Sequence, residues 1–180
     1  MDPRGPKDNI DGTARLMVIL AWVAGLAFAA YLFQQFLDRR FNPNRDLPTE
    51  AVAGAERSVV LLRNAQGHYV ADGFIDGHPV TFLLDTGATT VAIPEALARR
   101  WGLDLRPGGY SQTANGSVPV WRTRLREVQL GPIRLRDVSA VAMPSMAPDD
   151  PVLLGMSFLR RLELVQRDGR LLLRQPPGRR

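Results

Sequence analysis

The distribution of apolar residues divides the chain into two unlike parts. Residues 16–33, "LMVILAWVAGLAFAAYLF", contain no charged residue. As an α-helix this run would be about 27 Å long, close to the thickness of the hydrocarbon core of a bilayer. From residue 58 onward the apolar residues occur in short runs separated by Gly, Asp and Pro, which is typical of β-strands joined by tight turns. The pattern predicts one long helix followed by a small β-domain.

The apolar run at 16–33 has two interpretations. Ala27-Phe28-Ala29 resembles a cleavage site, so the run could belong to a cleaved signal peptide. The run continues beyond this site through Phe33, which favours an uncleaved transmembrane anchor. Positive charges flank its two ends equally, so the positive-inside rule does not decide the orientation. They are Arg4, Lys7 and Arg15 before the run and Arg39, Arg40 and Arg45 after it.

The segments around this run lack a periodic apolar pattern. We expect a short N-terminal tail at 1–15, a linker at 34–57 and a polar tail at 176–180. Pro43 and Pro48 lie in the linker, and proline interrupts both helices and strands. The folded domain is therefore expected to span residues 58–175.

Turn residues and helix signals predict the fold class of this domain. Asp76-Gly77 and Asp168-Gly169 each separate two apolar runs, which is a strong hairpin signal, and Gly131-Pro132 separates another pair. A helix is predicted at 95–101, because Pro94 suits a first helical position and Gly102 suits the stop. A second short helical turn is expected within 156–161. The domain is thus predicted to be all-β with one or two short helices.

Composition excludes several kinds of chemistry. The chain of 180 residues has no cysteine, which excludes disulfides, a thiolate nucleophile and cysteine-ligated zinc. It has two histidines, His68 and His78, which leaves little basis for a histidine triad or a histidine metal site. The formal net charge is +5, but the arginines are scattered and no aromatic platform accompanies them. We therefore do not expect nucleic-acid binding.

The candidate chemistry centres on Asp85, in "TFLLDTGATT" at residues 81–90. An apolar strand leads directly into this acid, and a carboxylate in such a place costs free energy unless it is hydrogen-bonded or functional. Gly87 offers an unshielded N–H to the carboxylate, Thr86 offers a hydroxyl, and Ala88 leaves an approach open. The alternative is a structural carboxylate that caps a turn. Two carboxyl groups about 3 Å apart could share one proton and act as acid and base.

Three segments in order resemble a known family. "LLDTGA" resembles the signature of aspartic proteases, and DTGA in so short a chain resembles retropepsins, the half-size homodimeric branch. Downstream, "SQTANGSVPV" at 111–120 resembles their flap, and "VLLGMSFL" at 152–159 resembles the element that packs beside the catalytic loop. Together with the N-terminal anchor, they resemble the bacterial membrane-anchored, retropepsin-like aspartic proteases. The likeness covers the whole of 58–175.

The resemblance implies a fold, a partner and site residues. It implies a closed β-barrel equivalent to half of a pepsin-type protease, acting as a homodimer on extended peptide without a metal or organic cofactor. The implied catalytic residues are Asp85, Thr86 and Gly87. The implied substrate-binding residues are Ala88, Ala114, Asn115, Gly116, Leu154 and Gly155. The implied location is the bacterial inner membrane, with the domain on the periplasmic side.

The sequence departs from the viral pattern in two places. Thr89 stands where viral retropepsins commonly have an acidic residue, and "TANG" replaces their Ile- and Gly-rich flap. Two other functions therefore stay open. One is a catalytically silent peptide-binding or scaffolding module on the same fold, which would bind peptide without forming product. The other is a monomeric lipid- or ligand-binding barrel on a stalk, which would show no affinity for peptide.

Overall fold

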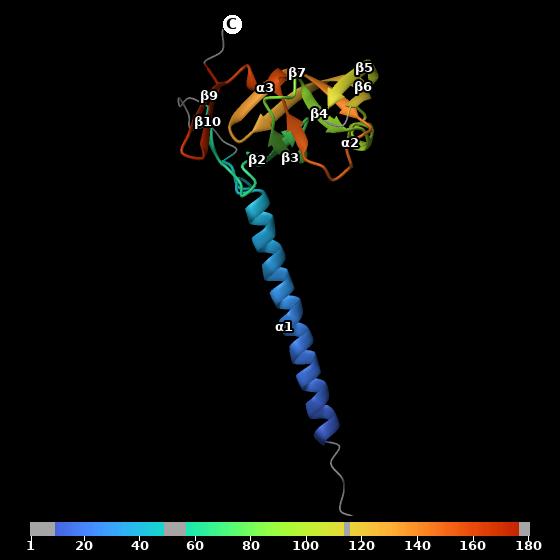
Figure 1. The fold of residues 1–180 in the computed structure, drawn as a ribbon, viewed down its shortest axis with the longest axis vertical. Helices are drawn as coiled ribbons and strands as arrows, with labels where there is room; N and C mark the ends of the chain where they lie inside the picture. The colour runs from blue at the N-terminus through green and yellow to red at the C-terminus, as the bar shows by residue number, and fades with distance from the viewer. Residues whose placement is uncertain (1–9, 49–56, 114–115, 177–180) are drawn as a thin grey trace, which may run out of the picture. The chain divides into compact units, whose positions relative to one another are not determined.

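The computed structural model describes residues 10–48, 57–113 and 116–176, and the chain divides into two compact units after Arg39 (Figure 1). Helix α1 (Ile10–Phe41) makes up the described part of the first unit and reaches into the second. Its side chains are exposed from Gly12 to Leu37. The window Gly12–Phe41 is long and apolar enough to cross a membrane. The predicted run at 16–33 therefore lies inside a longer helix.

The second unit is mostly β-structure. Its described helices are α2 (Glu95–Arg100) and α3 (Met156–Leu159). Its described strands are β1 (Ser58–Leu62), β2 (Val70–Ile75), β3 (His78–Leu84), β4 (Val91–Pro94), β5 (Arg106–Thr113), β6 (Gly116–Leu130), β7 (Ile133–Met143), β8 (Val152–Leu154), β9 (Glu163–Arg167) and β10 (Arg170–Arg174).

Six strands close into a barrel. The larger sheet has the order β2-β3-β8-β4-β7-β6-β5, and β2 also pairs with β6, so the sheet returns on itself and leaves β5 outside the ring. β5 and β6 form a hairpin that extends from the barrel. A smaller sheet has the order β1-β10-β9. The predicted all-β fold class with a closed barrel and short helices is confirmed.

The predicted hairpin turns are present. At Asp76-Gly77 both residues have positive φ, 49° and 85°, and the turn joins β2 to β3. Asp168-Gly169 has φ of 50° and 72° and joins β9 to β10. Both central residues in the left-handed region give a turn whose twist matches that of the strands it joins. The sequence therefore specifies these hairpins locally.

The core fills the barrel with alternate residues of its strands. Along β7, Ile133 and Leu135 are buried, and Val138 and Ala140 continue the buried face one residue out of step. Asp137, with φ of 53°, lies in this shift and acts as a bulge residue. Alternation of this kind places the side chains of one face of each strand in the core and those of the other face outside it.

The predicted helices are also present. α2 begins after Pro94 and ends at Arg100, Trp101 is its C-cap, and Gly102 follows with φ of 66°. α3 occupies part of the turn predicted at 156–161. Pro94 lies one residue before the helix rather than at its first position.

The segment after α1 differs from the linker expected at 34–57. α1 continues to Phe41, and Asn42 and Asn44 are buried in the second unit. The Asn44 side chain donates to the carbonyls of Leu62 and Val70, at 2.9 and 2.7 Å, and accepts from the Leu62 N–H at 2.7 Å. Hydrogen bonding of this kind satisfies buried backbone groups of β1 and β2. Residues 42–44 are thus part of the folded unit.

Candidate active site

Asp85 lies directly after β3, a strand in the middle of the barrel wall between β2 and β8. Its Oδ1 accepts a hydrogen bond of 2.8 Å from the N–H of Gly87, and its side chain is half-buried. A Cβ atom at position 87 would lie 3.1 Å from that same Oδ1. Glycine therefore lets the backbone approach the carboxylate. Thr86 and Gly87 themselves are exposed.

The loop that follows Asp85 is held by β8 and α3. The N–H of Asp85 donates to the carbonyl of Leu154 at 3.3 Å, which continues the parallel pairing of β3 with β8. The N–H of Met156 then donates to the Ala88 carbonyl at 2.8 Å, and the N–H of Ser157 donates to the Thr89 carbonyl at 3.0 Å. The first N–H groups of a helix have no partner within it. Here the loop carbonyls supply that partner.

Gly155 fits beneath this loop because it has no side chain. A Cβ atom there would lie 2.3 Å from the Thr90 carbonyl oxygen and 2.6 Å from the Ala88 carbonyl oxygen. Both neighbours are backbone atoms, so an added methyl group must displace the loop itself. Gly155 is buried and leaves room for the loop, and the substrate contact predicted for it stays a prediction.

Ser157 is a positioning residue that the sequence analysis missed. Its hydroxyl is buried, donates to the Ser139 carbonyl at 2.7 Å and accepts from the Val91 N–H at 3.1 Å. It thereby ties the start of β4, just after the loop, to β7. A single serine within an apolar segment gives no signal of this role in the sequence.

The remaining predicted site residues fall in different places. Ala88 is half-buried in the loop. Leu154 has no exposed surface and belongs to the core. This burial differs from the substrate-binding surface predicted for its side chain. Its neighbour Leu153 is half-buried and faces the other way. Gly116 begins β6 with φ of 107°. Ala114 and Asn115 lie outside the described residues.

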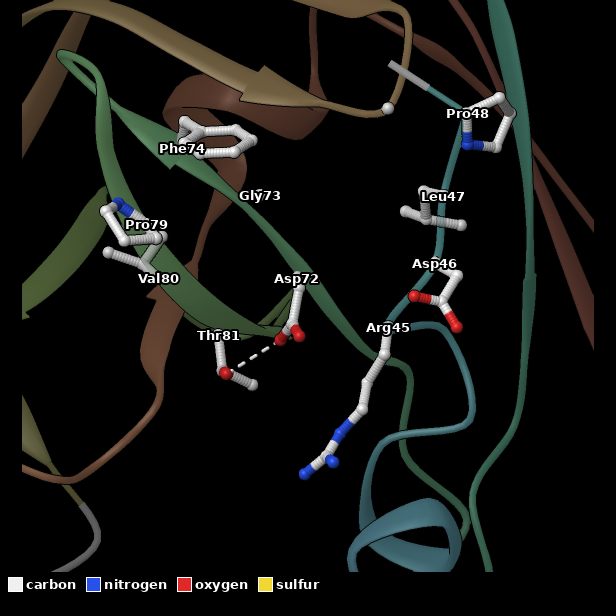
Figure 2. A pocket seen from close by; sticks show the side chains of 11 residues that line it. Arg45, Asp46, Leu47, Pro48, Asp72, Gly73, Phe74, Pro79, Val80 and Thr81 are labelled. Atoms are coloured by element: carbon white, nitrogen blue, oxygen red, sulfur yellow. Dashed lines mark hydrogen bonds between the residues drawn. The ribbon is translucent and has the colours of Figure 1, made fainter.

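A hollow lined in part by β2 and β3 is separate from Asp85. It measures about 740 Å³ and lies on the outer side of the β2–β3 hairpin. Figure 2 shows Phe74 and Pro79 on one side of it and residues 45–48 on the other. The carboxylate of Asp72 at its edge accepts from Thr81 Oγ1 at 2.8 Å and from Asn42 Nδ2 at 2.7 Å. Asp72 therefore serves to hold the segment after α1 against the barrel.

Comparison with known proteins identifies relatives of the second unit. The family described as "gag-polyprotein putative aspartyl protease" matches residues 71–161, half of the chain. This range begins in β2 and ends just after α3, so it includes the Asp85 loop, the β5–β6 hairpin and Gly155.

Two curated bacterial proteins are similar in sequence. The "Uncharacterized protein in cobV 5'region" of Sinorhizobium sp is 35% identical over 116 residues, which are 62% of this chain and 48% of that protein. "Uncharacterized protein RP867" of Rickettsia prowazekii (strain Madrid E) is 28% identical over 118 residues, 64% of this chain and 50% of that protein. The chain spans about half the length of the curated relatives it matches.

A solved structure shares the fold. The "retropepsin-like aspartic protease from Rickettsia conorii" is 26% identical and superposes with a TM-score of 0.58, covering 67% of this chain and 92% of that one. Because nearly all of that chain is matched, the similarity extends over its whole barrel. The retropepsin-like fold that the sequence motifs implied is thus confirmed.

Proposed function

The chain belongs to the retropepsin-like aspartic protease family, and on that premise we propose that it is an aspartic endopeptidase whose catalytic carboxyl group is Asp85. The observation that carries the proposal is the hydrogen bond from the Gly87 N–H to Asp85 Oδ1, in a loop that packs so closely on Gly155 that this glycine has no room for a side chain. General acid–base catalysis requires a carboxyl group held in a fixed position at an accessible site.

A second carboxyl group would come from a second copy of the chain. The sequence contains one Asp-Thr-Gly. Two such loops facing each other across a twofold axis would form one symmetric site. Two carboxyl groups about 3 Å apart cannot both ionise readily, so one keeps a proton while the other acts as a base. The exposed Thr86 would brace the opposite loop across this axis.

The reaction then follows from these two protonation states. The ionised Asp85 removes a proton from a water molecule, whose oxygen attacks the carbonyl carbon of the peptide bond. The protonated carboxyl group of the partner subunit's Asp85 donates a hydrogen bond to the carbonyl oxygen. When the tetrahedral intermediate collapses, the C–N bond breaks and the leaving nitrogen takes a proton from a carboxyl group. Each catalytic cycle consumes one water.

The β5–β6 hairpin would act as the flap. The described part of the hairpin ends at Thr113 on β5 and resumes at Gly116 on β6. These two residues are paired. Ala114 to Gly116 would contact the backbone of an extended peptide and exclude water from the site. Ala88 would form part of the floor beside the carboxylate. An extended peptide binds such a cleft by strand-like hydrogen bonding.

We further propose that α1 anchors the enzyme in the bacterial inner membrane, with the barrel in the periplasm. The length and apolar composition of Gly12–Phe41 support the anchor. Confinement to a membrane raises the effective concentration of two copies and so favours the dimer. It also places the site near envelope proteins, whose regulated cleavage is the role that we propose.

The test is cleavage of a diverse peptide library by the full chain in lipid nanodiscs, compared with Asp85→Asn. The wild-type chain should form products that a statine-type transition-state mimic blocks. Asp85→Asn should lower kcat/KM by about 100- to 10,000-fold, because it removes the acid and base together. Asp168→Asn is the matched control, because its carboxyl is exposed in the β9–β10 turn and asparagine tolerates positive φ. Circular dichroism would verify that the folds are unchanged.

A mixing experiment tests the shared site. When wild-type chains are exchanged with Asp85→Asn chains, each mixed dimer keeps one carboxyl group and should be inactive. Activity should then fall with the square of the wild-type fraction. A linear fall would contradict the dimer, and full activity of Asp85→Asn would overturn the mechanism. Peptide binding without any product would indicate the silent binding module.

A further inference from the structure

One row of paired residues crosses the barrel wall from the strand of Asp85 to the β5–β6 hairpin. Leu83 on β3 pairs with Leu153 on β8, and Leu153 pairs with Ala92 on β4. Ala92 pairs with Val141 on β7, and Val141 pairs with Arg122 on β6. Residues directly opposite each other on neighbouring strands have their side chains on the same face. The row is therefore apolar from β3 to β7 and basic at β6.

The row lies on the face of the wall that points away from the core. Phe82 and Leu84, on either side of Leu83, belong to the core or pack against it. Leu154, next to Leu153, is buried in the core. Since side chains alternate along a strand, Leu83 and Leu153 face outward. Asp85 follows Leu83 by two residues, so this outward face is the one that leads to the carboxylate.

The apolar section of this face is a cluster of its own, separate from the main core. Its buried members are Ala92, Val120 and Met143, and its partly buried members are Val118, Val141, Met146 and Leu153. Side chains from β4, β6, β7 and β8 thus form an apolar cluster on this face, and its partly exposed members are Val118, Val141, Met146 and Leu153. An extended peptide lying there would place apolar side chains against it.

The basic section borders a hollow of about 510 Å³. Thr90, at the end of the Asp85 loop, lines one side, and Arg106, Arg122 and Arg124 line another. The acid in the lining, Asp104, already binds Arg106 at 2.8 Å. Arg122 and Arg124 are exposed and point from the same face of β6, two residues apart.

These two arginines differ from the arginines further along β6 and on β7. Arg126 lies 3.7 Å from the carboxylate of Asp76, and Arg134 and Arg136 both lie near Glu127. Within the described ranges, neither Arg122 nor Arg124 forms an ion pair with a carboxylate of the chain. Their guanidinium groups are therefore open to an acidic ligand, which guanidinium can bind through two parallel hydrogen bonds.

We propose that the substrate is an extended peptide with apolar residues at the cleavage site and an acidic residue further along, bound by Arg122 and Arg124. This inference rests on the proposed protease function. The distance is counted from Leu153 on β8, which would contact the apolar residue at the cleavage site. Three strand spacings separate β8 from β6, about 14 Å at about 4.8 Å each, or about four residues of an extended peptide at about 3.3 Å per residue. A twofold dimer has such a basic patch at each end of its cleft. Acidic residues on both sides of the cleavage site should therefore each raise kcat/KM.

The test uses peptides that share one cleaved apolar core and carry Glu, Gln or Lys about four residues from the bond on each side. The protein is the full chain in nanodiscs of neutral lipid. Wild type should prefer Glu over Gln in kcat/KM by about two- to fivefold for each acidic residue, as exposed ion pairs do. The preference should disappear between about 0.01 M and about 1 M salt, because the Debye length falls from about 30 Å to about 3 Å.

Charge reversal gives the decisive comparison. Arg122→Glu with Arg124→Glu should invert the order, so that Lys peptides become the better substrates. Arg167→Glu with Arg170→Glu is the matched control, with the same change of charge on β9 and β10, which lie away from the β5–β6 hairpin (Figure 1). This control should keep the preference for Glu. An unchanged preference in the first variant, or a loss in the control, would overturn the inference.

Binding of the same peptides to Asp85→Asn separates this inference from the proposed function. If the wild-type chain cleaves the core without regard to charge, the inference fails and the protease remains. If no peptide is cleaved but Asp85→Asn binds Glu peptides more tightly than Gln peptides, the protease fails and the acidic ligand remains. If there is neither cleavage nor charge-dependent binding, both fail.

Discussion

The Asp85 loop and the segment after α1 solve the same problem in different ways. Each is an irregular stretch that lies against the barrel, and each must satisfy its backbone there. The Asp85 loop is held mainly by backbone donors of α3 and by the absence of a side chain at Gly155. The segment at 42–44 is held by asparagine side chains. The first arrangement fixes a reactive group, and the second fixes only the chain.

The comparison suggests that damage to the two regions should have different consequences. Displacement of the Asp85 loop should reduce catalysis more than stability, because small errors in position are costly to a reaction. Loss of the asparagine contacts should reduce stability and leave the chemistry of the folded molecules intact. Four substitutions test this beyond the removal of Asp85 itself, namely Gly155→Ala, Asn44→Ala, Ser157→Ala and Thr81→Val, and further variants serve as their controls.

Gly155→Ala should have the largest effect on catalysis. The added methyl group would contact two backbone carbonyls of the Asp85 loop, the nearer at 2.3 Å. A displacement of about 1 Å in an active site can cost about 100-fold in rate. Measurement of kcat/KM, corrected for the folded fraction from thermal unfolding, would test this.

Gly73→Ala is a matched control for that substitution. A Cβ atom there would lie 2.3 Å from the Gln129 carbonyl oxygen, the same distance as the nearest backbone contact at Gly155, and 2.7 Å from the Phe82 ring, but the site is on β2. We expect a similar loss of stability, about 1 to 3 kcal/mol for overpacking, with catalysis by folded molecules unchanged. Equal losses of kcat/KM in the two variants would show that the Asp85 loop has no special sensitivity.

Asn44→Ala should have the largest effect on stability in the other region. It leaves the carbonyls of Leu62 and Val70 and the N–H of Leu62 without their partner. A buried group left unsatisfied costs about 1 to 3 kcal/mol, so we expect the free energy of unfolding to fall by at least about 2 kcal/mol. Urea unfolding followed by tryptophan fluorescence would measure the change.

Asn44→Asp tests whether the donor or the acceptor of the Asn44 amide contributes the stability. It keeps an acceptor for the Leu62 N–H but replaces the donor that faces two carbonyls. If the donor is essential, Asn44→Asp should destabilise the chain at least as much as Asn44→Ala. A variant as stable as wild type would contradict the role assigned to the amide.

The sequence predicted the first of these regions and missed the second for a physical reason. The Asp85 loop is encoded by residues in fixed order, Asp-Thr-Gly and a distant Leu-Leu-Gly, so its spacing can be recognised. Asn42 and Asn44 act through partners at residues 62, 70 and 72 that only the fold brings near. A pair of prolines and polar residues in sequence looks like a linker whether or not its amides are buried.

A similar limit applies to the strands. Asp76-Gly77 and Asp168-Gly169 specify their hairpins locally, so these could be predicted. The parallel pairing of β3 with β8 joins residues far apart in sequence, and it decides which leucine faces the core. "VLL" is apolar at all three positions, so alternation could not distinguish Leu153 from Leu154. The row that ends at Arg122 also depends on pairings that no local pattern contains.

Ser157→Ala should have an intermediate effect. It leaves the Val91 N–H and the Ser139 carbonyl without the hydroxyl that joins them, with an expected cost of about 1 to 3 kcal/mol. Amide exchange at Val91 should become faster, which hydrogen-exchange mass spectrometry would detect. Ser139→Ala is the control, because Ser139 contributes its backbone carbonyl to this bond and should keep it. Unchanged exchange in Ser157→Ala would remove Ser157 from the set of positioning residues.

Thr81→Val should have the smallest effect. It removes one hydrogen bond to Asp72, which still accepts from Asn42 at 2.7 Å, so a loss of about 1 kcal/mol is expected. Because Thr81 and Asn42 donate to the same oxygen, Thr81→Val and Asn42→Ala should not be additive and should show a coupling of about 0.5 kcal/mol or more. Thr81→Val combined with Ser157→Ala should be additive, since these residues share no partner. Coupling in the second pair but not in the first would mean that the two regions are not held independently.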